Sequence, residues 1–275
     1  MNRVFSVAFV FVVFVFGLMP ISAQARIDIV PRKIVLDSRD RSAEITILNL
    51  FDKQGTFRID LVYNKQNEDG TYTVMEEPLD PNFDASKIVR FSPRQFTLPP
   101  KGRQKVRLSL RKPADLPEGE YRFHVKALRF AALDGADQQK TQDGASISMV
   151  MNLGITIPVV VRHGNLESDA QMSDVKLVTA STETGQPELH MTISRTGNQS
   201  TIGSLEAVWE PQGSSETDRI GYIDNMNLFT DITKRYVYLP LRYIPQGPGA
   251  IRLRYVENGL EKTKGNVYDE LLLEQ

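Results

Sequence analysis

Apolar and polar residues alternate along much of this chain, and the alternation is clearest in residues 146–164. Six apolar side chains occupy every second position there: Ile147, Met149, Met151, Leu153, Ile155 and Ile157. A period of two indicates a strand with one apolar face. With the valines at 159–161 it predicts a strand of about 15 residues, roughly 50 Å long, where most strands have about 5–6 residues. Something must cover so long an apolar face.

Shorter alternating stretches follow one another through the rest of the chain, with polar turns between them. We expect strands in the first half at 26–37, 42–50, 56–64, 88–98, 103–111, 120–130 and 146–162. In the second half we expect them at 174–181, 188–195, 203–210, 234–244, 249–257 and 268–275. Strands at this spacing predict antiparallel β-sandwiches, and about seven of them make an immunoglobulin-like domain.

The strands fall into two groups. The polar stretch 162–171 is expected to be a linker, and 134–146 a polar loop before the long strand. We therefore predict an all-β protein of two immunoglobulin-like β-sandwich domains, at 26–164 and 165–275. The second is the smaller.

The first 25 residues have the pattern of a secretory signal. A basic start is followed by an apolar run from Val4 to Met19, and then by Ala23 and Ala25 as a cleavage site. A membrane anchor is the alternative, but the run is shorter than the roughly 20 residues of a membrane span. We expect cleavage after Ala25 and no membrane insertion of the remainder.

Composition limits the compartment and the partners. The chain has no cysteine, so an exported form must be stable without disulfides, which favours a bacterial periplasm. Its 33 basic and 34 acidic residues balance to a formal net charge of −1. This balance gives no general attraction to nucleic acid, and we expect no nucleic-acid partner.

Signals for enzymatic chemistry are weak. The three histidines, His124, His163 and His190, do not have the spacing of metal ligands, and no phosphate-binding or nucleophile motif occurs. We expect no enzyme activity, no cofactor and no metal.

Residues 120–130 place different chemistry on the two faces of one strand. The core-facing set should be Tyr121, Phe123, Val125 and Ala127, and the opposite set is Arg122, His124 and Lys126. The basic set is either a solvated outer face or a docking surface for a carboxylate-bearing group.

The apolar strand at 146–162 has two interpretations. It is either an ordinary core strand, or an edge strand that accepts a foreign strand by β-augmentation.

Four segments together resemble the periplasmic chaperones of the chaperone–usher pilus pathway, in a divergent, archaic-like branch. They are 27–37, 90–110, 116–128 and 146–164, and the second half matches more loosely. The resemblance implies two domains in a boomerang arrangement. It also implies a non-enzymatic periplasmic chaperone that completes a pilus or fimbrial subunit with its own strand. An outer-membrane usher then receives the subunit.

The resemblance also assigns residues. The donor side chains would be Ile147, Met149, Met151, Leu153 and Ile155. Lys33 falls at the family's first-strand basic position, where it would anchor the subunit's C-terminal carboxylate. The family's second anchor falls on Pro158, so Arg122 or Arg162 would substitute for it. Self-association of the free protein is left open. The alternative function is a secreted two-domain adhesive or structural protein in which 146–162 is plain core.

Overall fold

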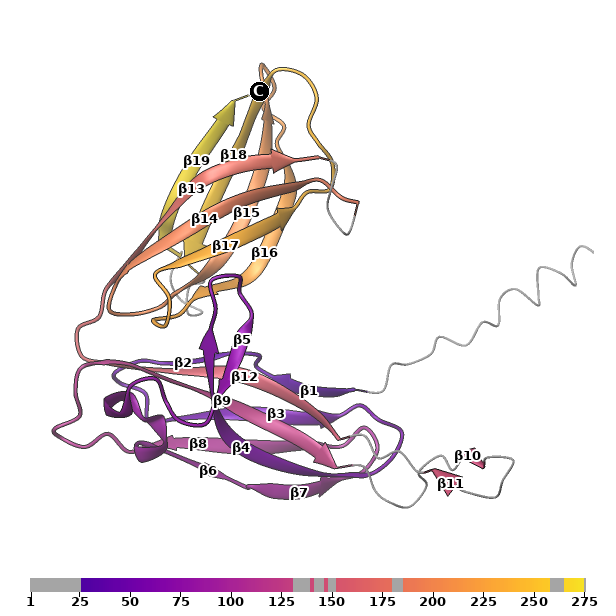
Figure 1. Ribbon diagram of the computed structural model, residues 1–275, viewed down its shortest axis with the longest axis vertical. Helices are drawn as coiled ribbons and strands as arrows, with labels where there is room; N and C mark the ends of the chain where they lie inside the picture. The colour runs from indigo at the N-terminus through magenta and orange to yellow at the C-terminus, as the bar shows by residue number, and fades with distance from the viewer. Residues whose placement is uncertain are drawn as a thin grey trace, which may run out of the picture.

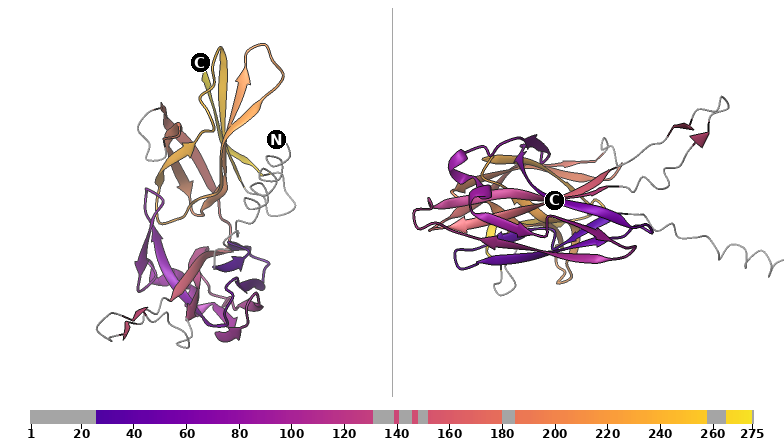
Figure 2. Two further views of the ribbon diagram at one scale, coloured as in Figure 1. Left: turned by 90° about the vertical axis from the view of Figure 1, so that its right-hand side faces the viewer. Right: turned by 90° about the horizontal axis from the view of Figure 1, so that it is seen from below.

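The computed structural model describes residues 26–130, 139–140, 146–147, 152–179, 185–257 and 265–274. Two β-sandwiches stack end to end along the long axis of the molecule (Figure 1). Seen from below, the second lies behind the first (Figure 2). The predicted all-β class with two immunoglobulin-like sandwiches is confirmed. The predicted signal segment 1–25 lies outside the described residues. No helix in the described ranges is long and apolar enough to cross a membrane.

The first sandwich packs two sheets face to face, and their strands are antiparallel except for one pair. One has the strand order β1 (Ile27–Val30), β3 (Ser42–Asn49), β8 (Arg103–Leu110), β6 (Val89–Ser92). The other has the order β2 (Ile34–Leu36), β12 (Leu153–His163), β9 (Gly119–Phe130), β4 (Gly55–Gln66), β5 (Tyr72–Met75), with β7 (Gln95–Leu98) also on β4. The only parallel pair among these strands is β2 with β12. Two short 3₁₀ helices, η1 (Pro81–Phe83) and η2 (Ala85–Lys87), follow β5.

Two stretches expected as single strands are each two strands in different sheets. Residues 26–37 divide into β1 and β2 on either side of Pro31. Residues 88–98 divide into β6 and β7 on either side of Pro93. Proline has no N–H to donate to a ladder, so the chain leaves one sheet there and enters the other.

The second sandwich has a three-stranded and a four-stranded sheet. The first has the order β13 (Ser168–Val178), β14 (Glu188–Gly197), β17 (Lys234–Pro240). The second has the order β16 (Asp218–Leu228), β15 (Thr201–Pro211), β18 (Gly249–Glu257), β19 (Val267–Glu274). The predicted linker 162–171 was too long, because β12 runs to His163 and β13 starts at Ser168.

The core of the first sandwich follows the sequence pattern of β9. Tyr121, Phe123, Val125 and Ala127 are all buried in it, as predicted. They pack with the alternate side chains Ile157, Val159 and Val161 of β12. Lys126 is half-buried on the opposite face of β9, but His124 on that face is buried too.

Gln66, at the end of β4, joins the two sandwiches. The hairpin of β4 and β5 stands up against the second sandwich (Figure 1). The Gln66 side chain is buried, donates to the Asn227 carbonyl at 3.0 Å and accepts from the Phe229 N–H at 2.8 Å. Its own N–H donates to the Asp231 carboxylate at 2.6 Å. Further along the hairpin, the Tyr236 N–H donates to the Glu68 carbonyl at 2.7 Å.

A buried ion pair lies beside Gln66. The guanidinium of Arg122 pairs with Asp231, and the two side chains are 8% and 6% exposed. The same guanidinium lies 4.2 Å from the centre of the Phe229 ring. Val160 of the first sandwich packs with Ile202 and Phe229 of the second in a small apolar cluster. Polar and apolar contacts thus fix the second sandwich on the first.

We expect Asp231→Asn to lower the unfolding free energy by about 3 kcal/mol, because it leaves the Arg122 charge buried without a counter-ion. The matched control is Asp60→Asn, which breaks the pair of Arg58 and Asp60, whose side chains are 49% and 36% exposed. That change should cost under about 1 kcal/mol. Denaturant unfolding of both variants measures the difference, and a loss in Asp231→Asn no larger than that in Asp60→Asn would contradict the dependence of the buried Arg122 charge on Asp231.

Candidate functional site

β12 is paired along both edges over only part of its length. Val159–Val161 pair with Ile34–Leu36 of β2 on one edge, while Leu153–His163 pair with β9 on the other. Among the described residues, 153–158 have no partner on the β2 side. Their backbone groups on that side are free to pair with another strand.

The path of the chain through Pro31 explains why the edge is open. The segment before Pro31 belongs to β1, which pairs with β3 in the opposite sheet. The chain reaches the sheet of β12 only at Ile34, so β2 covers three residues of β12 and no more. The open edge is therefore a consequence of the strand switch.

The apolar side chains of β12 emerge from the core toward its open end. Ile157 is 2% exposed, Ile155 is half-buried against the core, and Leu153 is 39% exposed. The predicted long strand is confirmed from Leu153 onward. Ile147 is placed in β11 (Ser146–Ile147), where it pairs with Gln139 of β10 (Gln139–Lys140). The other two predicted donor residues, Met149 and Met151, lie outside the described residues.

Lys33 lies where the open edge ends. It directly precedes β2, and because Ile34 pairs with Val159, Lys33 comes beside Pro158 of β12. Its Nζ is buried and has no hydrogen-bond partner in the described part of the chain. Burial lowers the pKa of Lys33 to about 8, with a smaller lowering from Arg162 and an opposing effect of Asp224 in the second sandwich. A buried ammonium without an acceptor is a candidate anchor for a carboxylate.

The other two predicted anchors already have partners. Arg162 donates to Glu120 at 3.4 Å and to the Ser200 carbonyl at 3.1 Å. Arg122 pairs with Asp231 and donates to the Asn64 carbonyl at 3.0 Å, both through Nη2, while its buried Nη1 has no partner among the described residues. Arg162 is close enough to influence Lys33, whereas Arg122 belongs to the domain junction. The geometry favours Lys33 among the three, and their anchoring role stays a prediction.

His124 is a buried base that the sequence pattern placed on an outer face. It lies opposite Pro158 in the sheet and is 3% exposed, and its Nδ1 has no hydrogen-bond partner in the described part of the chain. Its ring meets the Tyr72 ring edge to face, with the centroids 5.7 Å apart. Burial and then the Arg122 charge lower the pKa of His124 to about 3, so the imidazole is neutral at physiological pH. Its burial by the β5 hairpin was not readable from the sequence.

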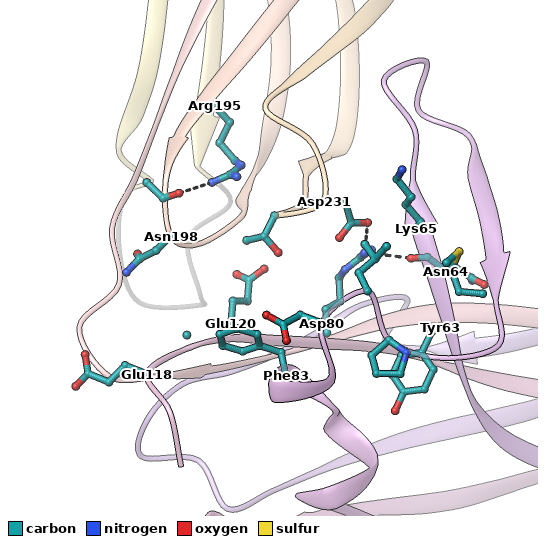
Figure 3. Close-up of a pocket in the computed structure, with 17 residues that line it drawn as sticks. Tyr63, Asn64, Lys65, Asp80, Phe83, Glu118, Glu120, Arg195, Asn198 and Asp231 are labelled. Carbon is teal, nitrogen blue, oxygen red and sulfur yellow. Dashed lines mark hydrogen bonds and ion pairs between the residues drawn. The ribbon is translucent and has the colours of Figure 1, made fainter. Parts of the chain in front are cut away.

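A pocket of about 420 Å³ also lies between the sandwiches. Figure 3 shows Arg195 and Asp231 of the second sandwich on one side of it, and Tyr63, Phe83 and Glu120 of the first on the other. Its deepest carboxylates are already engaged, Asp231 by Arg122 and Glu120 by Ser200. They are not a free acid–base pair. No cluster of metal-ligating side chains occurs in the described ranges.

Comparison with known proteins gives only distant similarity. No family model and no curated protein matches the sequence. Among solved structures, the E. coli chaperone DraB is 10% identical to this chain, with a TM-score of 0.44, and the match covers 91% of this chain and 96% of that one. A chain of the CsuC–CsuE chaperone–tip adhesion subunit complex, from archaic chaperone–usher Csu pili of Acinetobacter baumannii, has 14% identity and a TM-score of 0.40, covering 91% and 98%. A chain of the Salmonella enterica SafA pilin–SafB chaperone complex has 11% identity and a TM-score of 0.41, covering 91% and 97%. Similarity at this level supports no conclusion about function.

We expect Lys33→Met to raise the unfolding free energy at pH 7 by about 1–2 kcal/mol, since it removes a desolvated charge that solvent screens in part. In the wild type, the native state loses the Lys33 proton near pH 8, while the unfolded state keeps it to about 10.5. Wild-type stability should therefore rise relative to Lys33→Met as the pH increases from 7 to 10. Urea unfolding at both pH values tests this. A variant less stable than the wild type would mean that Lys33 has a stabilising partner.

Proposed function

We propose that this protein is a periplasmic chaperone for pilus or fimbrial subunits, which it stabilises by lending them β12 and delivers to an outer-membrane usher. The observation that carries the proposal is the open edge of β12 with an apolar face that emerges from the core at Leu153. An open edge supplies backbone hydrogen bonds to a guest strand, and the emerging side chains supply specificity.

The energetics of such a complex rest on side chains that leave water on binding. Each fully buried aliphatic side chain contributes about 1.5–3 kcal/mol. Leu153 and Ile155 belong to this set, and the sequence alternation extends it to Met149, Met151 and Ile147, although Ile147 lies in β11 in this structure. Ordering of the guest strand offsets part of the gain. A subunit that lacks one strand of its own sandwich is the partner for which such a strand is useful.

Lys33 determines the direction of the guest strand. It lies at the end of the open edge nearest to the β2 pairing, beside Pro158. A guest whose C-terminal carboxylate reaches Lys33 must extend from there back along 157–153. Its chain then runs in the same direction as β12. The guest is therefore a parallel neighbour that continues the line of β2.

The alternative is a secreted adhesive or structural protein in which β12 is only a core strand. In that case Leu153 would contribute to folding and not to binding. Usher delivery rests on the sequence resemblance, and no described residue carries it.

Leu153→Arg separates the two functions. We expect it to weaken the 1:1 complex with a pilin-like subunit by at least about tenfold, because the guanidinium cannot enter the subunit core without losing its hydration. The free protein should keep its fold, since Leu153 is 39% exposed. The subunit is co-expressed with the wild type or the variant, and its solubility and its 1:1 complex are measured in a periplasmic extract. Met151→Arg is a second variant for the same test.

The control on the same strand is Ile157→Arg, which should unfold the first sandwich because Ile157 is 2% exposed. Unchanged subunit binding by Leu153→Arg would refute strand donation. Unfolding of Leu153→Arg would favour the adhesive or structural protein.

Subunit binding should also depend on the charge of Lys33. The free protein loses this charge near pH 8, and a carboxylate pairs only with the ammonium. We expect the affinity to fall about tenfold between pH 7 and pH 9. Lys33→Arg should show no such fall, because a guanidinium stays charged. Calorimetric titration with the subunit at both pH values measures the affinity. An equal pH dependence of the wild type and Lys33→Arg would exclude Lys33 as the anchor.

A further inference from the structure

Two buried nitrogens that have no hydrogen-bond partner among the described residues flank Pro158 on the two neighbouring strands. They are Nζ of Lys33, just before β2, and Nδ1 of His124 on β9. A buried polar nitrogen that lacks a hydrogen-bond partner destabilises the protein. Two of them on either side of one residue point to a ligand that supplies acceptors to both.

Strand pairing puts both side chains on the same face of the sheet. Ile34, Phe123 and Val159 point into the core of the first sandwich. Side chains alternate along a strand, so their neighbours Lys33, His124 and Pro158 lie on the opposite face, toward the second sandwich. The backbones of Lys33 and His124 are two strand spacings apart, about 10 Å, with Pro158 between them.

Pro158 itself contributes no donor to this space. It has no N–H, and its side chain is apolar. Arg122, on the same face of β9 as His124, pairs with Asp231 through Nη2, and its buried Nη1 has no hydrogen-bond partner among the described residues. The Tyr72 ring of β5 meets the His124 ring edge to face, and Lys33 lies two strands away from His124 on its other side.

We propose that His124 is the second donor of the carboxylate site, with Lys33 supplying the charge and the imidazole donating an N–H to the other carboxylate oxygen. This inference rests on the proposed function and names the residue that serves beside Lys33. A neutral imidazole carries one N–H, so it acts as a donor without adding a second buried charge. Lysine and histidine together offer one donor to each oxygen of a single carboxylate.

The test uses two synthetic peptides of about 15 residues from the C-terminus of a pilin-like subunit that this protein binds, one with a free carboxylate and one amidated. His124→Phe should lower the affinity for the peptide with the free carboxylate, the acid peptide, about tenfold. This is the effect of losing one hydrogen bond to a charged group. It should leave the amide peptide unchanged. His124→Asn, whose amide nitrogen takes the place of Nδ1, should bind the acid peptide within about threefold of the wild type.

A merely structural role would weaken both peptides equally in His124→Phe, and that result, or no loss at all, would overturn the inference. The imidazole ¹⁵N resonances of His124 give an independent readout. They should shift with the acid peptide and not with the amide, and an equal response to both would also overturn it. If the wild type binds neither peptide, strand donation itself fails. Urea unfolding confirms that each variant is folded.

Discussion

The geometry of the space between the two sandwiches depends on the buried ion pair of Arg122 and Asp231. Such a pair adds little net stability, because both charges lose their hydration, but removal of one partner is costly. It therefore favours one orientation of the second sandwich over others. Gln66 reinforces this with three hydrogen bonds across the same junction. The orientation brings Asp224 of β16 near enough to Lys33 to influence its charge.

The second constraint is the half-paired strand β12. Proteins usually protect an open edge with charges, bulges or covering segments, because it attracts other strands. Here the first sandwich leaves 153–158 unpaired on one side in the described part of the chain, and exposes Leu153 next to that edge. Pro31 and Pro158 limit how far the first strand can follow β12. One edge of β12 is open because the chain enters this sheet only at β2. Such an edge is well suited to a transient partner that supplies the missing neighbouring strand.

The strands β9 and the second half of β12 could be predicted from their alternation of apolar and polar residues, because one face of each strand packs in the core. The strand switches at Pro31 and Pro93 were missed, although each proline was visible as a break in a ladder. β5 is short and mostly exposed, and β16 is irregular, with pairing shifts against β15, so neither has a clean period. Lys33 could be singled out because it falls at the first-strand basic position of the family that the sequence resembles. The burial of His124 could not be predicted, because it depends on Tyr72, which is 52 positions away in a strand that was not predicted.

Hydrogen exchange of the β12 amides tests the open edge most directly. In the free protein, the amides in 153–157 that point away from β9 should exchange rapidly. The amides of Val159–Val161, where β12 is paired with β2, should exchange slowly. Addition of the pilin-like subunit should protect these amides in a 1:1 complex. Slow exchange already in the free protein, or unchanged fast exchange in the complex, would contradict strand donation by β12.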